Sequence, residues 1–218
     1  MRALFLALAA LTLSVTLGAC NQVYSRAPLL SEAHEAGDPE FRPGLWRISG
    51  YEDRCAFDIR KRLRDWPDCA VGVEFRRGQM WLVSGHQRVL AQAQRLTEGP
   101  PILLQARWTS AIFSDPRVPE PRDTDNPLFG WVYAAVTPGR LDDNGRMIEA
   151  TMVQALCGPP PLAPTGRPPR LASDHPFPGL TVSGNNCVAK DLDTVKTVLA
   201  LSAGLGAPQT MKWVRDDP

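Results

Sequence analysis

The residues best suited to chemistry are five cysteines, at positions 20, 55, 69, 157 and 187, and three histidines, at positions 34, 86 and 175. Structural zinc sites usually space their paired ligands about two to four residues apart, and no two of these cysteines lie that close. A serine nucleophile needs a histidine base, but no Gly-x-Ser-x-Gly motif accompanies the histidines. We therefore expect no metal ion, no cofactor and no catalytic residue.

Pairs of carboxylates could instead hydrolyse a glycan, provided that two carboxyl groups face each other in space. Asp142-Asp143 precedes Asn144-Gly145, a composition typical of a turn, and Glu52-Asp53 is interpreted as the rim of a loop. Neither pair by itself indicates an active site. The expectation is that the protein is not an enzyme, and a hydrolase stays as an alternative.

The first twenty residues have the composition of an export signal. Arg2 is followed by an uncharged run over 3–17, and the chain becomes polar again at Asn21. This run is shorter than the roughly 20 residues that a permanent membrane span requires. Leu17-Gly18-Ala19-Cys20 resembles the lipobox of bacterial lipoproteins, in which the cysteine sulfur receives a diacylglycerol, a peptidase cuts before it, and the new amino group is acylated.

This resemblance implies that residues 1–19 are removed and that fatty acyl chains, such as palmitate, hold Cys20 in a membrane. The alternative is an ordinary secretory signal cut after Ala19, with Cys20 incidental. In enteric bacteria an aspartate after the lipidated cysteine favours the inner membrane, and Asn21 stands here instead. The resemblance therefore implies the outer membrane, on its periplasmic side, with the inner membrane as the alternative.

The other four cysteines form an even set in a chain bound for an oxidising compartment, which predicts two disulfides. Three pairings are possible. We favour the sequence-local one, which joins Cys55 to Cys69 and Cys157 to Cys187.

Charge gives little information about partners. The chain has 24 basic and 23 acidic residues, and loss of Arg2 with the signal peptide leaves 23 of each. A neutral protein has no overall field to attract nucleic acid, so none is expected. The expected partners are the membrane, through the lipid anchor, and an unidentified protein or ligand of the cell envelope.

Proline, glycine and strand patterns divide the mature chain. Residues 20–42 show no sustained periodicity and are predicted to be a lipidated tether, whose 22 residues after Cys20 would extend to about 75 Å. Residues 43–218 are predicted to form one β-rich domain, with proline-rich loops at 115–127 and 158–179. Alternating strands are expected near 45–48, 71–76, 80–83, 102–109, 130–136, 147–156 and 210–215, and a helix at 192–202, capped by Asp191. The predicted fold class is α+β, mainly an antiparallel sheet or partly closed barrel with one C-terminal helix.

A dense basic stretch contains Arg54, Arg60, Lys61, Arg62 and Arg64. Guanidinium groups bind phosphate well, so contact with lipopolysaccharide is one interpretation. Aspartates interleave with these residues, however, and a solvated loop that pairs with itself is the interpretation that we favour.

Gly44-Leu45-Trp46 resembles the Gly-x-Trp opening of calycin barrels, the lipocalins and their relatives. In that family a basic residue from the end of the barrel packs over the tryptophan, and Arg215 is the residue that the resemblance implies here. It also implies a barrel that carries an apolar ligand or inhibits a protease. That function is the alternative to our main expectation, a non-catalytic binding or structural module of the cell envelope.

Overall fold

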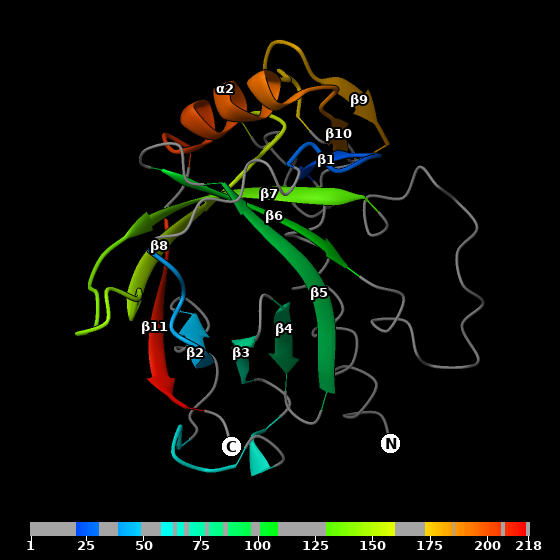
Figure 1. The fold of residues 1–218 in the computed structure, drawn as a ribbon. Coiled ribbons are helices and arrows are strands. Elements are labelled where there is room, and N and C mark those ends of the chain that lie inside the picture. Colours follow the sequence, from blue (N-terminus) through cyan, green and yellow to red (C-terminus); the bar gives the residue numbers. More distant parts are fainter. Residues whose placement is uncertain are drawn as a thin grey trace, which may run out of the picture.

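The computed structural model describes residues 21–30, 39–48, 58–62, 65–67, 70–76, 79–84, 87–96, 101–108, 130–159, 173–184, 186–205 and 208–216. In this part of the chain, 11 strands belong to one sheet, and a helix follows the tenth strand (Figure 1). The fold is therefore mainly antiparallel β with one C-terminal helix, as the sequence predicts.

Eight antiparallel strands are joined in a closed ring. They are β2 (Gly44–Ile48), β3 (Val71–Arg76), β4 (Gln79–Ser84), β5 (Gln87–Leu96), β6 (Ile102–Trp108), β7 (Trp131–Pro138), β8 (Glu149–Gln154) and β11 (Gln209–Arg215). From β2 to β8 each strand pairs with the next along the chain. The last strand, β11, pairs with both β8 and β2, which completes the ring.

The alternation of side chains in β2 explains how the ring separates inside from outside. Trp46 and Ile48 belong to an apolar cluster with residues of β3, β4, β6, β7, β8 and β11. Because so many strands of the ring contribute one face to this cluster, it lies in the interior. Leu45 points the other way and packs with Trp66 on the outside.

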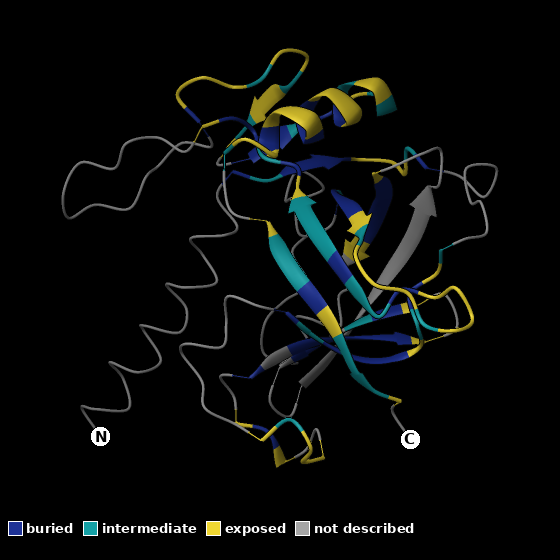
Figure 2. Ribbon diagram, turned by 90° about the vertical axis from the view of Figure 1, so that its left-hand side faces the viewer, coloured by how far each residue is buried: buried dark blue, intermediate teal, exposed yellow. Residues whose placement is uncertain are grey.

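A smaller layer covers the outside of the ring next to β7. It contains β1 (Val23–Ser25), β9 (Thr181–Ser183), β10 (Asn186–Val188) and α2 (Leu192–Ser202), which lie above the ring in Figure 1. β1 pairs with β7 in antiparallel and with β10 in parallel orientation. Val195, Val198 and Leu199 form the buried face of α2 and belong to the apolar cluster beneath the helix. The other face of α2 is exposed (Figure 2).

Asp191 begins α2 as predicted. Its carboxylate accepts hydrogen bonds from the Thr194 backbone N–H (2.8 Å) and hydroxyl (2.6 Å). These bonds, the hydroxyl's above all, lower the pKa of Asp191 because they stabilise the charged carboxylate. The helix therefore starts where the sequence placed its cap.

The prediction that residues 20–42 form a tether is wrong for their described parts, which belong to the domain. Val23 and Tyr24 lie in β1 with almost no exposed surface, and Leu30 and Phe41 are buried as well. Gln105 on β6 holds the segment after β1: its side-chain oxygen accepts from the backbone N–H groups of residues 29 and 30, and its amide donates to the residue 30 carbonyl. The sequence showed no periodicity here because the segment takes its hydrogen bonds from distant parts of the chain.

Other strand predictions are confirmed with small shifts of their ends, namely β2, β3, β4, β6, β7, β8 and β11. The sequence did not predict β5, which has a single β-branched residue, Val89, and no aromatic residue, whereas such residues are typical of strands. The proline-rich loop at 115–127 lies outside the described residues. Of the loop at 158–179, residues 158–159 and 173–179 are described, and they contain no helix or strand.

Candidate functional site

The disulfide between Cys157 and Cys187 is present, as predicted. Their Cα atoms are 5.5 Å apart, and both residues are fully buried in the apolar cluster beneath α2. The bridge ties the end of β8 to β10. Cys20, Cys55 and Cys69 lie outside the described residues. Because Cys157 is taken by Cys187, a bond between Cys55 and Cys69 is the remaining pairing within the predicted set, and peptide mapping can test it.

The first described residue, Asn21, is bonded directly into this end of the molecule. Its carbonyl accepts from the Cys157 N–H (2.9 Å), and its side-chain amide donates to the Gly158 carbonyl (3.0 Å). Its backbone φ is 115°, a left-handed conformation that asparagine tolerates better than most residues. Asn21 is only 7% exposed, so this first described residue is already part of the fold.

Gln22 and α2 complete what we call the disulfide end. The Gln22 N–H donates to the Asn186 side chain (3.1 Å), and its carbonyl accepts from the Cys187 N–H (2.9 Å). Ser202, the last residue of α2, accepts through its hydroxyl from the Leu156 N–H (3.0 Å). Residues 21 and 22, the disulfide and the C-terminal end of α2 therefore meet at one place.

Tyr133 anchors β1 to the ring. Its hydroxyl shares a short hydrogen bond of 2.5 Å with the Ser25 hydroxyl, which also donates to the Ala27 carbonyl. Burial raises the pKa of Tyr133 to about 12, because the charged phenolate would lose its hydration. This polar pair sits inside the apolar cluster and fixes the position of β1 on β7.

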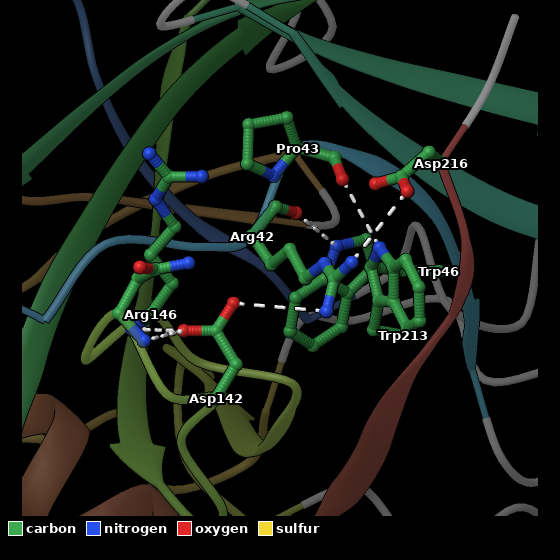
Figure 3. Close-up of polar contacts among 8 residues, drawn as sticks. Arg42, Pro43, Trp46, Asp142, Arg146, Trp213 and Asp216 are labelled. Atoms are coloured by element: carbon green, nitrogen blue, oxygen red, sulfur yellow. Dashed lines mark hydrogen bonds and ion pairs between the residues drawn. The ribbon is translucent and has the colours of Figure 1, made fainter.

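Four residues form a second polar cluster, which we call the Arg42 cluster (Figure 3). The Arg42 guanidinium lies over the Trp213 ring at 3.7 Å, a cation–π contact. It also contacts Asp142 at 3.7 Å and Asp216 at 3.5 Å. Trp213 and Asp216 come from the end of β11, and Asp142 comes from the connection between β7 and β8.

Local structure explains why these residues meet. Asp142 begins the predicted turn, and its carboxylate accepts from the N–H groups of Asn144 and Arg146, both at 2.9 Å. These bonds, chiefly that from Arg146, and the nearby charge of Arg42 lower the pKa of Asp142. The indole N–H of Trp213 donates to the Pro43 carbonyl at 3.0 Å (Figure 3). Arg42 is therefore clamped between two carboxylates and a ring.

Gly44 makes the approach of β11 possible. Its φ is 117°, and a Cβ atom there would lie 2.3 Å from the Arg215 carbonyl oxygen. Any other residue would be strained and would push β11 away from β2. Gly44 therefore lets the last strand close the ring.

The role that the calycin resemblance implied for Arg215 is not observed. Arg215 pairs with Leu45, whose side chain lies outside the ring, whereas Trp46 lies inside. Its guanidinium donates to the carbonyls of Ile59 (3.0 Å) and Lys61 (2.8 Å). A β-bulge between residues 213 and 215 shifts the register, and the Trp213 ring lies under Arg42.

The described part of the basic stretch is a surface loop. Arg60, Lys61 and Arg62 are exposed, while Ile59 packs against Leu45 and Trp66. The loop is fixed by Arg215 and by the Trp66 indole, which donates to the Lys61 carbonyl (3.1 Å). Within 58–62 and 65–67, nothing brings these cations together around a common anion site. Arg54 and Arg64 lie outside the described residues.

The remaining candidate residues do not converge. His175 is exposed in the described part of the 158–179 segment, and His34 and His86 lie outside the described residues. Glu74 is buried on β3 with an Arg76 nitrogen at 2.6 Å, an ion pair that sequence reasoning did not single out. No group of three potential metal ligands occurs among the described residues. Within the same ranges, no helix is long and apolar enough to cross a membrane.

Comparisons with protein-family models, curated proteins and solved structures found no match to this chain. Its function must therefore be inferred from the predicted export signal, the disulfide end and the Arg42 cluster. The disulfide end is built around the residue that would follow a lipid anchor. In the Arg42 cluster the carboxylates of Asp142 and Asp216 are both paired with the Arg42 guanidinium, so the cluster presents fixed, paired charges.

Proposed function

We propose that the protein is a bacterial lipoprotein, anchored through acyl chains on Cys20 and working as a non-catalytic binding or structural module of the cell envelope. The observation that carries the proposal is the sequence Leu17-Gly18-Ala19-Cys20, followed at once by a folded residue, Asn21. A lipid at Cys20 would then be attached directly to the domain. The Cys157–Cys187 bridge supports an oxidising compartment, such as the periplasm.

Anchoring is consistent with the physics of acyl chains. Each buried methylene contributes about 0.8 kcal/mol, so one chain gives marginal binding and two or three give stable binding. Asn21 in place of aspartate supports the outer membrane, facing the periplasm, as the destination. The inner membrane is the alternative outcome of a fractionation experiment.

The anchor can be tested by metabolic labelling with a radioactive fatty acid in the native bacterium. The wild-type protein should be labelled, and Cys20→Ser should not be. Cys69→Ser is the matched control, since it removes a cysteine of the mature chain and should keep the label. Label that persists in Cys20→Ser would disprove the anchor.

A binding or structural role rests on the character of the described polar clusters. Arg42 is held by two carboxylates and a tryptophan, and the Glu74 carboxylate lies against Arg76. Such charge-paired groups stabilise a rigid surface and supply no free general base. Affinity capture of the native protein from solubilised membranes, compared with capture of the Cys20→Ser protein, should retain one stoichiometric envelope partner. Turnover of envelope glycan by the purified protein would contradict the proposal and favour a hydrolase.

A second candidate, an apolar carrier or protease inhibitor of the calycin kind, is favoured by the closed ring of eight antiparallel strands. Part of the interior is occupied: Phe41 stacks on Phe75 at 4.0 Å and meets Trp46 edge-on at 5.3 Å. A ligand would have to lie away from these rings. Native mass spectrometry of protein extracted in mild detergent should reveal a bound apolar molecule if the carrier function is correct.

A further inference from the structure

We propose that the disulfide end of the domain sits directly on the phospholipid bilayer, so that the lipid anchor fixes the orientation of the domain as well as its location. This inference rests on the proposed lipidation of Cys20. It follows from the absence of any spacer between that residue and the fold. The occupant of the surface is therefore the bilayer in which the acyl chains of Cys20 are embedded.

The length of the connection is set by covalent geometry. Cα atoms joined by a trans peptide bond are about 3.8 Å apart, so Asn21 lies one residue from the lipidated cysteine. With the acyl chains in the hydrocarbon, the cysteine backbone stays in the headgroup region. Asn21 and the atoms bonded to it must then lie at the same depth or just above it.

The fold resists release of this segment. Asn21 is bonded to Cys157 and Gly158, and Gln22 to Asn186 and Cys187. Freeing a spacer of even four residues would expose Val23 and Tyr24, which are 1% and 0% exposed. The disulfide joins Cys157, which binds Asn21, to Cys187, which binds Gln22. Asn21 and Gln22 therefore cannot move away together with only one of these two partners.

The side chains around this end suit a lipid surface. Three large apolar side chains are exposed in the described part of the chain, namely Leu141 (45%), Val182 (47%) and Leu201 (42%). Leu201 precedes Ser202, whose hydroxyl accepts a hydrogen bond from the Leu156 N–H. Leu156 in turn forms a β-bridge with Gln22. Val182 pairs with Cys187, which in turn pairs with Val23. Two of the three therefore flank the point where the chain enters the fold.

Leu141 lies at the other end of the same strands. The chain runs from Met147, which bridges to Leu141, through β8 to Leu156 at the disulfide end. At about 3.3 Å per residue, this distance is about 25 to 30 Å. The turn after Leu141 carries Asp142 of the Arg42 cluster, so in the proposed orientation that cluster faces away from the bilayer, toward a periplasmic partner.

The experiment compares two positions of nearly equal exposure. The full lipidated protein carries either Leu201→Cys or Leu141→Cys, is labelled there with a polarity-sensitive fluorophore under non-reducing conditions, and is reconstituted into vesicles of phosphatidylcholine brominated on the acyl chains near the headgroup. The label at 201 should shift to shorter wavelength and be quenched several-fold more than the label at 141. Thermal unfolding of each labelled protein checks that the fold is kept.

A third protein separates orientation from anchoring. A flexible Gly-Ser insert of 16 residues between Cys20 and Asn21 has an end-to-end distance of about 22 Å and should release the domain from the surface. Quenching at 201 should then fall to the level at 141, while the protein still floats with the vesicles. Equal quenching at both positions without the insert, in protein that floats, overturns this inference alone. Protein from the native host that carries no acyl group and does not float overturns the proposed function, and this inference with it.

Discussion

Removal of the Cys157–Cys187 bridge should destabilise the domain by an amount that can be calculated from its loop. The two residues are 30 positions apart, and the chain-entropy model gives about 3.7 kcal/mol for a loop of that length. Folded domains of this size are typically stable by about 5 to 15 kcal/mol. Replacement of both cysteines by alanine should therefore cost a quarter or more of the total free energy of unfolding.

Urea unfolding of the unlipidated domain, followed by tryptophan fluorescence, measures this loss. The Cys157→Ala/Cys187→Ala protein should unfold at lower urea with an equal or steeper slope, because its unfolded chain is more expanded. The single variant Cys187→Ala is the control, since it breaks the same bridge and should lose nearly the same free energy. A loss below about 1 kcal/mol in the double variant would refute the assignment of stability to this loop.

Three further predictions concern the segment that replaces the expected tether. Asn21→Asp should destabilise the domain by about 1 to 3 kcal/mol in urea, because a carboxylate cannot donate to the Gly158 carbonyl; an unchanged midpoint would contradict that bond. Gln105→Leu should cost about 3 kcal/mol by leaving two N–H groups and one carbonyl buried without their partner, and Gln105→Glu, which keeps the acceptor, should cost less. Stability contributed by neutral Tyr133 should be complete below pH 10 and decline from there toward pH 12, by on the order of 2 kcal/mol; Tyr133→Phe should flatten that decline.

Sequence reasoning succeeded where a single local pattern determines the structure. Trp46 and Ile48 alternate with Leu45 because one face of β2 lies inside the ring, and that period is visible in the sequence. Asp191 and the turn at Asp142 were predicted because their side chains bond to backbone groups only a few residues away. Each of these features depends on neighbours in the chain.

It failed where the partners are distant. β1 has only three residues, too few to show a period, and its hydrogen bonds come from β7 and β10. Arg42, rather than Arg215, covers a tryptophan because a bulge in β11 sets the register, and a bulge leaves no clear mark in this sequence. One signal for the segment at 20–42 was present in the sequence. It has two pairs of adjacent large apolar residues, at 23–24 and 29–30, which are unusual in a solvated linker.

The closing of the ring sets the order in which the molecule can assemble. β2 finds one partner in β3, which follows it directly, but the other only in β11, which is made after β3 to β10 and the helix. β1 likewise waits for β10. On the proposed lipoprotein pathway, the bond between Ala19 and Cys20 would be cut before those strands have paired and before Asn21 has its hydrogen-bond partners in the fold. A chain that loses its last ten residues should be exported and cut normally, yet never complete its fold.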